Sequence, residues 1–195
     1  MADEKKIEKA FALFDAYNSN DIHKDKVEEK VFPKEFLYAV RMTEKLNHYA
    51  PSAPETVRLA ARCQHIGRWE ISRDSYPMDK KGYLQWRSQL AIHHAKVAQD
   101  ILLECGYEQP LIDSVKFLLQ KKQLHQNPDT QLLEDVICLV FIEFYLDEFA
   151  HQHDDEKVID ILKKTMKKMS QKALGEAIKI PVSNHVKKLI EKAAS

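Results

Sequence analysis

The stretch YLQWRSQLAIHHAKVAQDILLEC, residues 83–105, decides the fold class of this chain. Its apolar residues recur at intervals of three and four, as on one face of an α-helix, and Gly106 ends the pattern. Similar helical patterns fill most of the sequence, with loops expected at residues 18–30 and 68–81. No run alternates with the period of two that marks a strand. We therefore predict an all-α fold without a sheet.

The length of 195 residues suits one domain with a sizeable core. We predict a single helical domain over residues 1–195, built as an orthogonal bundle. Helices are expected at about residues 7–14, 33–48, 55–67, 83–105, 109–121, 127–149, 154–169 and 183–194.

Composition excludes several function classes. Lys+Arg and Asp+Glu both count 30, so nucleic acid is not the favoured partner, because proteins that grip it are usually more basic. Four glycines are too few for a P-loop or a Rossmann fingerprint. The three cysteines fit neither a disulfide framework nor a zinc site. No apolar run is long enough for a membrane, and the N-terminal stretch MADEKKIEKA lacks a secretory signal, so we expect a cytoplasmic protein.

Two ionisable residues fall on the apolar face of the 83–105 helix. His94 lies three or four residues from Leu90 and Val97, and Arg87 precedes it by two turns. A lone histidine on such a face is commonly a buried residue whose ring is hydrogen-bonded within the core. His94 could instead act as an acid/base group or bind phosphate. Arg87 on the same face favours this second interpretation, because a buried guanidinium needs an anion.

Two further helices carry ionisable residues near their apolar faces. Arg58, Arg62 and His65 line one face of the 55–67 helix, which is either a solvated stripe or the wall of an anion pocket. Asp135 lies in the first turns of a central helix. It either compensates the helix dipole or acts as a metal ligand or general base.

The 68–81 loop and its neighbours supply further cations and aromatic rings. Such a set beside a histidine suits a phosphorylated, ring-bearing ligand such as a nucleotide. The residues expected to bind substrate are Arg62, Arg68, Trp69, Arg73, Tyr76, Arg87 and Lys122.

The segment LAARCQHIGRW, residues 59–69, resembles the second motif of HD-domain phosphohydrolases, which reads as an apolar run, His-Asp, then Ile-Gly. The order of a His-bearing helix, HHAKVAQDILLECGY, and a late acidic residue, in LEDVICLV, also matches. The resemblance covers about residues 34–150. It implies an HD-like core with extra N- and C-terminal helices, the last at about 154–195. In that superfamily one or two metals activate water for attack on a phosphate ester.

The HD motif carries over only in part. Asp135 matches the late Asp, but the His-Asp pair falls on Gln64 and His65. The first-helix His falls near Glu44, with His48 one turn later as an alternative. The resemblance thus implies a divalent metal ion held by Glu44, His65 and Asp135. His65, His94 and Asp135 are the expected catalytic residues.

The chain also closely resembles an uncharacterised all-helical family that is loosely labelled glutamyl-tRNA synthetase-like. The matching stretches include RMTEKL, QHIGRWEISRDSYPMDKKGYLQWR and KTMKKMS. HIGR at 65–68 and KMSQK at 168–172 echo two synthetase signatures. Those signatures belong to a nucleotide fold of strands and Gly-rich turns, so synthetase activity is not expected.

Three functional hypotheses follow. The leading one is a divergent HD-like phosphohydrolase acting on a nucleotide or another phosphorylated small molecule. The second is a nucleotide- or anion-binding module without catalysis. The third is an RNA-associated helical protein that uses the lysines from Lys164 to Lys168.

Overall fold

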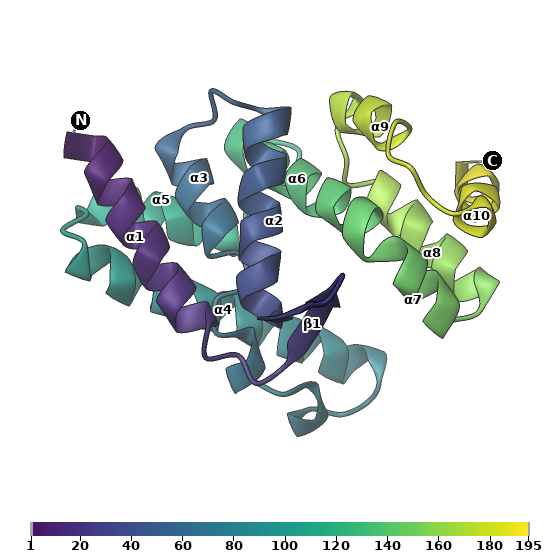
Figure 1. Cartoon of the computed structure of the whole chain (residues 1–195), viewed down its shortest axis with the longest axis horizontal. Coiled ribbons are helices and arrows are strands. Elements are labelled where there is room, and N and C mark those ends of the chain that lie inside the picture. Colours follow the sequence, from purple (N-terminus) through teal and green to yellow (C-terminus); the bar gives the residue numbers. More distant parts are fainter. Residues whose placement is uncertain (1, 195) are drawn as a thin grey trace. The chain divides into compact units, whose positions relative to one another are not determined.

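A computed structural model describes residues 2–194 of the chain, with side chains from residue 4 onwards. Most of this part is α-helical, so the predicted helical fold is confirmed (Figure 1). Its contacts divide into two compact units, of which the first ends at Lys122 and the second begins at Gln123. A single domain over the whole chain, the HD-like core and the orthogonal packing all stay predictions.

The first unit is built around helix α3, which contacts α1, α2 and α5. Val57, Leu59, Ala60 and Ala61 of α3 are all buried, because a short helix surrounded by others has little solvent-facing surface. Helix α4 packs against α5 and α1. The elements of this unit are α1 (Ala2–Asn18), β1 (Lys24–Val27), β2 (Lys30–Pro33), α2 (Lys34–Tyr49), α3 (Glu55–Arg62), the 3₁₀ turns η1 (Arg68–Glu70) and η2 (Arg73–Ser75), α4 (Lys80–Glu104) and α5 (Gln109–Leu119).

A small antiparallel hairpin corrects the prediction of a fold without a sheet. Strands β1 and β2 pair from Lys24 opposite Pro33 to Val27 opposite Lys30, and both strands contact α2. Each strand has four residues, which is too short for a period of two to stand out in the sequence. The turn has Glu28 at a φ of 52°, a conformation that sequence rules assign mainly to Gly, Asn or Asp.

Helix boundaries in the first unit follow capping chemistry. Asp79 accepts a hydrogen bond from the Gly82 amide, 2.6 Å away, and α4 therefore begins at Lys80, slightly earlier than predicted. Gly106 has a φ of 78° and ends α4, as the sequence predicted. Helix α3 is shorter than predicted, because the chain turns after Arg62 toward Gly67.

The second unit centres on α6, whose face is buried from Leu133 to Ile142. The helix predicted over 127–149 is interrupted at Tyr145, where the backbone leaves helical geometry without a proline or glycine to mark the break. Helix α9 was not predicted. The elements are α6 (Pro128–Phe144), α7 (Leu146–Gln152), α8 (Asp155–Met166), α9 (Gln171–Ala177) and α10 (Asn184–Ala194), with α8 packed on α10.

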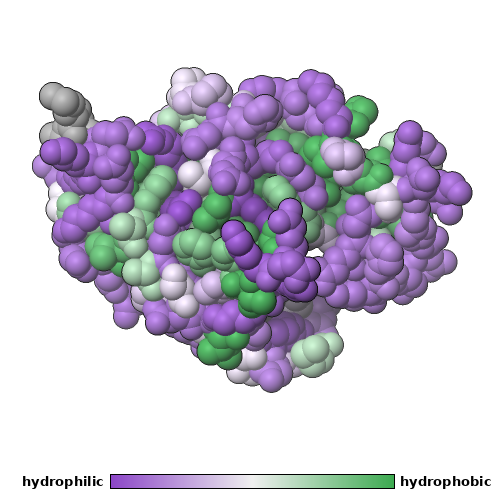
Figure 2. Space-filling view, in the orientation of Figure 1, coloured by the Kyte–Doolittle hydropathy of each residue, from purple (hydrophilic) through white to green (hydrophobic). Residues whose placement is uncertain are grey.

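Surface hydropathy fits the charged composition. Figure 2 shows a face on which hydrophilic side chains predominate and hydrophobic ones gather in smaller patches. None of the helices in the described part of the chain combines the length and apolar character needed to cross a membrane.

Candidate functional site

The first unit contains a half-open cavity of about 370 Å³. Three segments supply its walls: the turns between α3 and η1, one face of α4, and the end of α5. Its lining is mixed, with cationic and polar side chains beside small aliphatic ones. The lining residues are Gln64, His65, Arg68, Arg87, Ser88, Leu90, Ala91, Ile92, His94, Leu119, Gln120 and Lys121.

Gly67 positions the turn that brings His65 and Arg68 to the cavity. It adopts a φ of 68°, in the left-handed region that favours glycine. A Cβ atom at this position would lie 2.8 Å from His93 Nε2 and 3.2 Å from the ring of Tyr17. Both the backbone angle and the close packing therefore require glycine here.

His65 is held by three neighbours. Its ring stacks on Tyr38, with centroids 4.2 Å apart and planes 13° from parallel. Its Nε2 atom lies 3.3 Å from Arg68 Nη1, and its Nδ1 atom lies 3.3 Å from Glu35 Oε2. Because a guanidinium only donates, Nε2 accepts, and the ring proton sits on Nδ1 facing the carboxylate. The arrangement fixes the tautomer of His65 and couples it to Glu35.

Glu35 is a buried carboxylate in the first turn of α2. Its backbone amide donates to Asp21 Oδ2 at 3.0 Å, so Asp21 caps the helix that carries it. Burial raises the pKa of Glu35 to about 7; the positive charge of Arg68 opposes this rise and Asp21 adds to it. A carboxyl group with that pKa can exchange protons near neutral pH.

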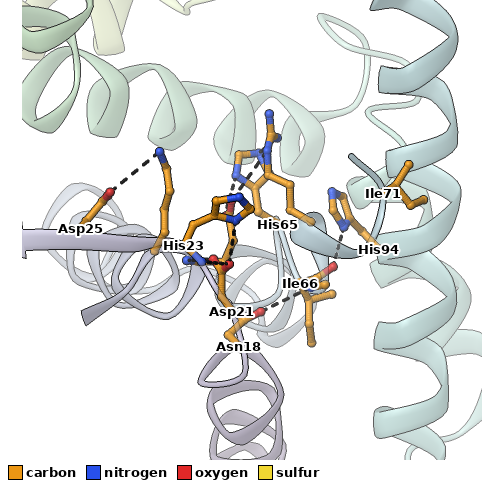
Figure 3. A network of polar contacts seen from close by, with 12 residues as sticks. Asn18, Asp21, His23, Asp25, His65, Ile66, Ile71 and His94 are labelled. Carbon is orange, nitrogen blue, oxygen red and sulfur yellow. Dashed lines mark hydrogen bonds and ion pairs between the residues drawn. The ribbon is translucent and has the colours of Figure 1, made fainter. Parts of the chain in front are cut away.

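His94 comes from α4 and is buried beside His65, with ring centroids 5.9 Å apart. Its Nδ1 atom donates to the carbonyl oxygen of Ile66 at 2.6 Å, drawn in Figure 3. Burial lowers the pKa of His94, and the neighbouring His65 lowers it further, so the ring is neutral. With Nδ1 protonated, Nε2 carries the lone pair, and no described residue hydrogen-bonds to it. His94 is therefore hydrogen-bonded to the core through Nδ1, and its Nε2 atom remains available as a base in a residue that lines the cavity.

Cationic groups line the same cavity. Burial lowers the pKa of the Arg68 guanidinium, which Glu35 raises and the nearby Arg87 lowers. The Arg68 guanidinium also lies 5.0 Å from the Trp86 ring centroid. Two guanidinium groups close enough to repel each other form a site that an anion would stabilise.

The profile of a family described as "Domain of unknown function (DUF4202)" matches residues 8–190. The chain belongs to the DUF4202 family. It has no significant match among curated proteins or among solved structures. The expectation of an uncharacterised helical family is thus confirmed, and the HD-domain and synthetase-like resemblances stay predictions.

Several residues predicted to bind substrate in the DUF4202 chain have other partners. Arg62 pairs with Asp15, with Nε 2.7 Å from Oδ1, and this pair ties α3 to α1. Arg73 donates to the carbonyl oxygens of Tyr76 and Pro77 and so braces the loop before α4.

Other predicted residues also lie outside the cavity lining. The ring of Trp69 packs near that of Tyr17, with their centroids 5.9 Å apart. Lys122 is exposed and outside the lining, which takes Lys121 instead. Of the predicted set, the cavity of the DUF4202 chain gathers His65, Arg68, Arg87 and His94.

Asp135 lies in the second unit, in α6. Its carboxylate accepts hydrogen bonds from the Ser170 amide at 2.8 Å, from the Ser170 hydroxyl and from Gln131 Nε2 at 2.9 Å. Ser170 is the N-cap of α9, so Asp135 fastens that cap to α6. Its predicted catalytic role, and its meeting with His65 and His94, stay predictions.

Two of the predicted metal ligands have very different surroundings. Glu44 is exposed on α2, nine residues after Glu35, whereas Asp135 is engaged by Ser170. Within residues 4–194, no three His, Cys, Asp or Glu side chains are grouped so that they could hold a metal ion. The divalent metal ion that the HD resemblance implies stays a prediction.

The lysines of the third hypothesis are partly neutralised. Lys164 pairs with Asp160, and Lys168 lies 3.4 Å from the buried Glu134. A helix face with such intrahelical and local pairs is typical of a solvated surface.

Glu35 is the site residue that sequence reasoning missed. It precedes Tyr38, Ala39 and Met42 by three, four and seven residues, so it lies on the buried stripe of α2. The signal was therefore present: a carboxylate on an apolar face, which needs a partner.

Proposed function

We propose that the cavity of the first unit binds a phosphorylated small molecule and hydrolyses its phosphate ester. The observation that carries this proposal is that two guanidinium groups, of Arg68 and Arg87, line the same cavity as two imidazoles. Arginine recognises phosphate through several donors in a fixed fork, and adjacent imidazoles supply acid and base.

The proton transfers follow from the hydrogen bonds of the histidines. Water attacks the phosphorus atom, and the bond from phosphorus to the ester oxygen breaks. His94 Nε2 accepts the proton that the water loses, since its Nδ1 proton is committed to Ile66. When the phosphate draws Arg68 away from His65 Nε2, that nitrogen takes up a proton beside the Glu35 carboxylate and gives it to the leaving oxygen. The pKa of Glu35, about 7, lets the Glu35–His65 pair hold that proton at neutral pH.

Substitutions on opposite sides of the cavity separate binding from chemistry. Arg87→Met should weaken binding of phosphate esters about tenfold or more, since a charge-assisted hydrogen bond is lost. Arg58→Met is the matched control, because Arg58 pairs with Glu4 and lies outside the lining. His94→Gln should keep binding but lower turnover by about 10² or more.

The assay measures release of inorganic phosphate from a panel of monoesters, with added Mg²⁺, with added Mn²⁺ and with a chelator. The two added metals test the divalent ion that the HD resemblance implies. Unchanged turnover in His94→Gln would remove that residue from the mechanism. Failure of every phosphate compound to bind would end the proposal.

A binding module without catalysis is the second candidate. It is favoured by one observation: both ring nitrogens of His65 are engaged, by Glu35 and by Arg68. Tight binding of a phosphorylated compound, with no turnover under any metal condition, would select this candidate.

A further inference from the structure

The neutral part of the cavity restricts what the phosphate can be attached to. Gln64 is 4 % exposed, and its Oε1 atom is buried without a hydrogen-bond partner among the described residues. A buried acceptor without a donor is rare in folded proteins and calls for an explanation. Because the Gln64 side chain also lines the cavity, a bound molecule is well placed to provide the donor.

Phosphate itself cannot be that donor. The dianion of a phosphate monoester has no O–H group and only accepts hydrogen bonds, so it satisfies Arg68 and Arg87 but not an amide oxygen. The terminal torsion of a glutamine is broad, so its amide can turn Oε1 toward the cavity at little cost. The buried amide oxygen therefore calls for a hydroxyl or amine donor on the ligand.

The apolar wall indicates a compact carbon skeleton. Leu90, Ala91, Ile92 and Leu119 have aliphatic side chains, and none of the described lining residues is Phe, Tyr or Trp. The tryptophans of the first unit lie outside this lining: Trp86, for example, is buried and donates to the Ile71 carbonyl oxygen at 2.9 Å.

The covered face of His65 and the volume of the cavity both favour a small ligand without an aromatic ring. His65 has one ring face covered by Tyr38. The volume of about 370 Å³ is at the small end of ligand cavities.

We infer that the ligand is a phosphate ester of a small hydroxylated, non-aromatic compound, of the pentose phosphate class, and not a nucleotide. Gln64 recognises a hydroxyl group of that compound, while Arg68 and Arg87 hold its phosphate. This inference rests on the proposed function, since it uses the same cavity and the same phosphate-binding arginines.

Three probe compounds separate the contributions of phosphate, sugar and base to binding. AMP carries adenine in place of the anomeric hydroxyl of ribose 5-phosphate, and inorganic phosphate lacks the sugar altogether. Calorimetric titration should give ribose 5-phosphate an affinity at least tenfold above that of AMP and that of inorganic phosphate. AMP binding as tightly as ribose 5-phosphate would overturn the inference and leave the proposed function standing. Absence of binding by all three probes would remove the proposed function, and the inference with it.

A substitution tests the role of Gln64. Gln64→Met keeps the length of the side chain but removes its amide, and should weaken the affinity for ribose 5-phosphate about tenfold while changing the affinity for inorganic phosphate less than twofold. Gln89→Met is the matched control, because Gln89 is exposed on α4 and outside the lining. Equal weakening of both probes, in a variant with wild-type circular dichroism, would refute the hydroxyl contact.

Discussion

Replacement of Glu35 by Gln should remove a specific pH dependence of stability. Folding raises the pKa of this carboxyl group from 4.5 to about 7, mainly through burial. Between these pH values the folded protein keeps the proton that the unfolded chain has already lost. The free energy of unfolding therefore falls as pH rises through this window and levels off above it. At 1.36 kcal/mol per pKa unit, the loss is about 3 kcal/mol.

The measurement is urea denaturation of wild type and Glu35→Gln at pH values from 4.5 to 8. Tryptophan fluorescence reports on the first unit, because both tryptophans, Trp69 and Trp86, lie in it. Other titrating groups are common to both proteins, so the difference between their unfolding free energies isolates Glu35. That difference should fall by about 3 kcal/mol as pH rises to 7 and then stay constant.

The control is Glu44→Gln, which removes an exposed carboxylate from the same helix and leaves Glu35 in place. Its difference from wild type should vary little with pH. A flat difference for Glu35→Gln would refute the buried, proton-exchanging carboxyl, and with it the proton source assigned to the leaving oxygen.

Three further substitutions test the packing around the site and in the second unit. Gln64→Met should raise the free energy of unfolding by about 1 kcal/mol in urea, since it removes a buried amide oxygen without a partner; a less stable variant would contradict that assignment. Asp135→Ala should destabilise the second unit by about 2 kcal/mol, because Ser170 loses its acceptor. Hydrogen exchange of α9 amides measures this effect, and unchanged protection would argue against the cap. Gly67→Ala should cost about 2 kcal/mol or more in thermal unfolding, since it combines a positive φ with a Cβ atom 2.8 Å from His93; a wild-type melting temperature would show that the turn adapts.

The buried histidine of α4 illustrates how far a helical pattern reaches. The period of 3.6 placed His94 on the stripe of Leu90 and Val97, and the structure confirms that all three are buried. The same pattern could not choose between a core histidine and a base. The hydrogen bond to Ile66, 28 residues earlier, gives one ring nitrogen to the core and leaves the other for chemistry.

Arginines show the opposite limit. Arg62 and Arg68 look equivalent in sequence, as cations near a histidine at the end of a helix. Arg62 forms an ion pair with Asp15 of α1, whereas Arg68 contacts Glu35 and His65. The partners lie 47 and 33 residues away from these arginines, and only the packing of helices decides which cation meets which carboxylate.

The residue pattern alone is enough to recognise a helical chain, to locate most of its helices, and to place His94 on a buried face. Those properties depend on neighbours within one or two turns, which the spacing of apolar residues records. Helix packing, in contrast, is what sets Glu35 against His65, pairs Arg62 with Asp15, and makes Asp135 the acceptor that fastens a helix cap. Side chains from distant segments meet through packing, and local spacing carries no information about which of them will be neighbours.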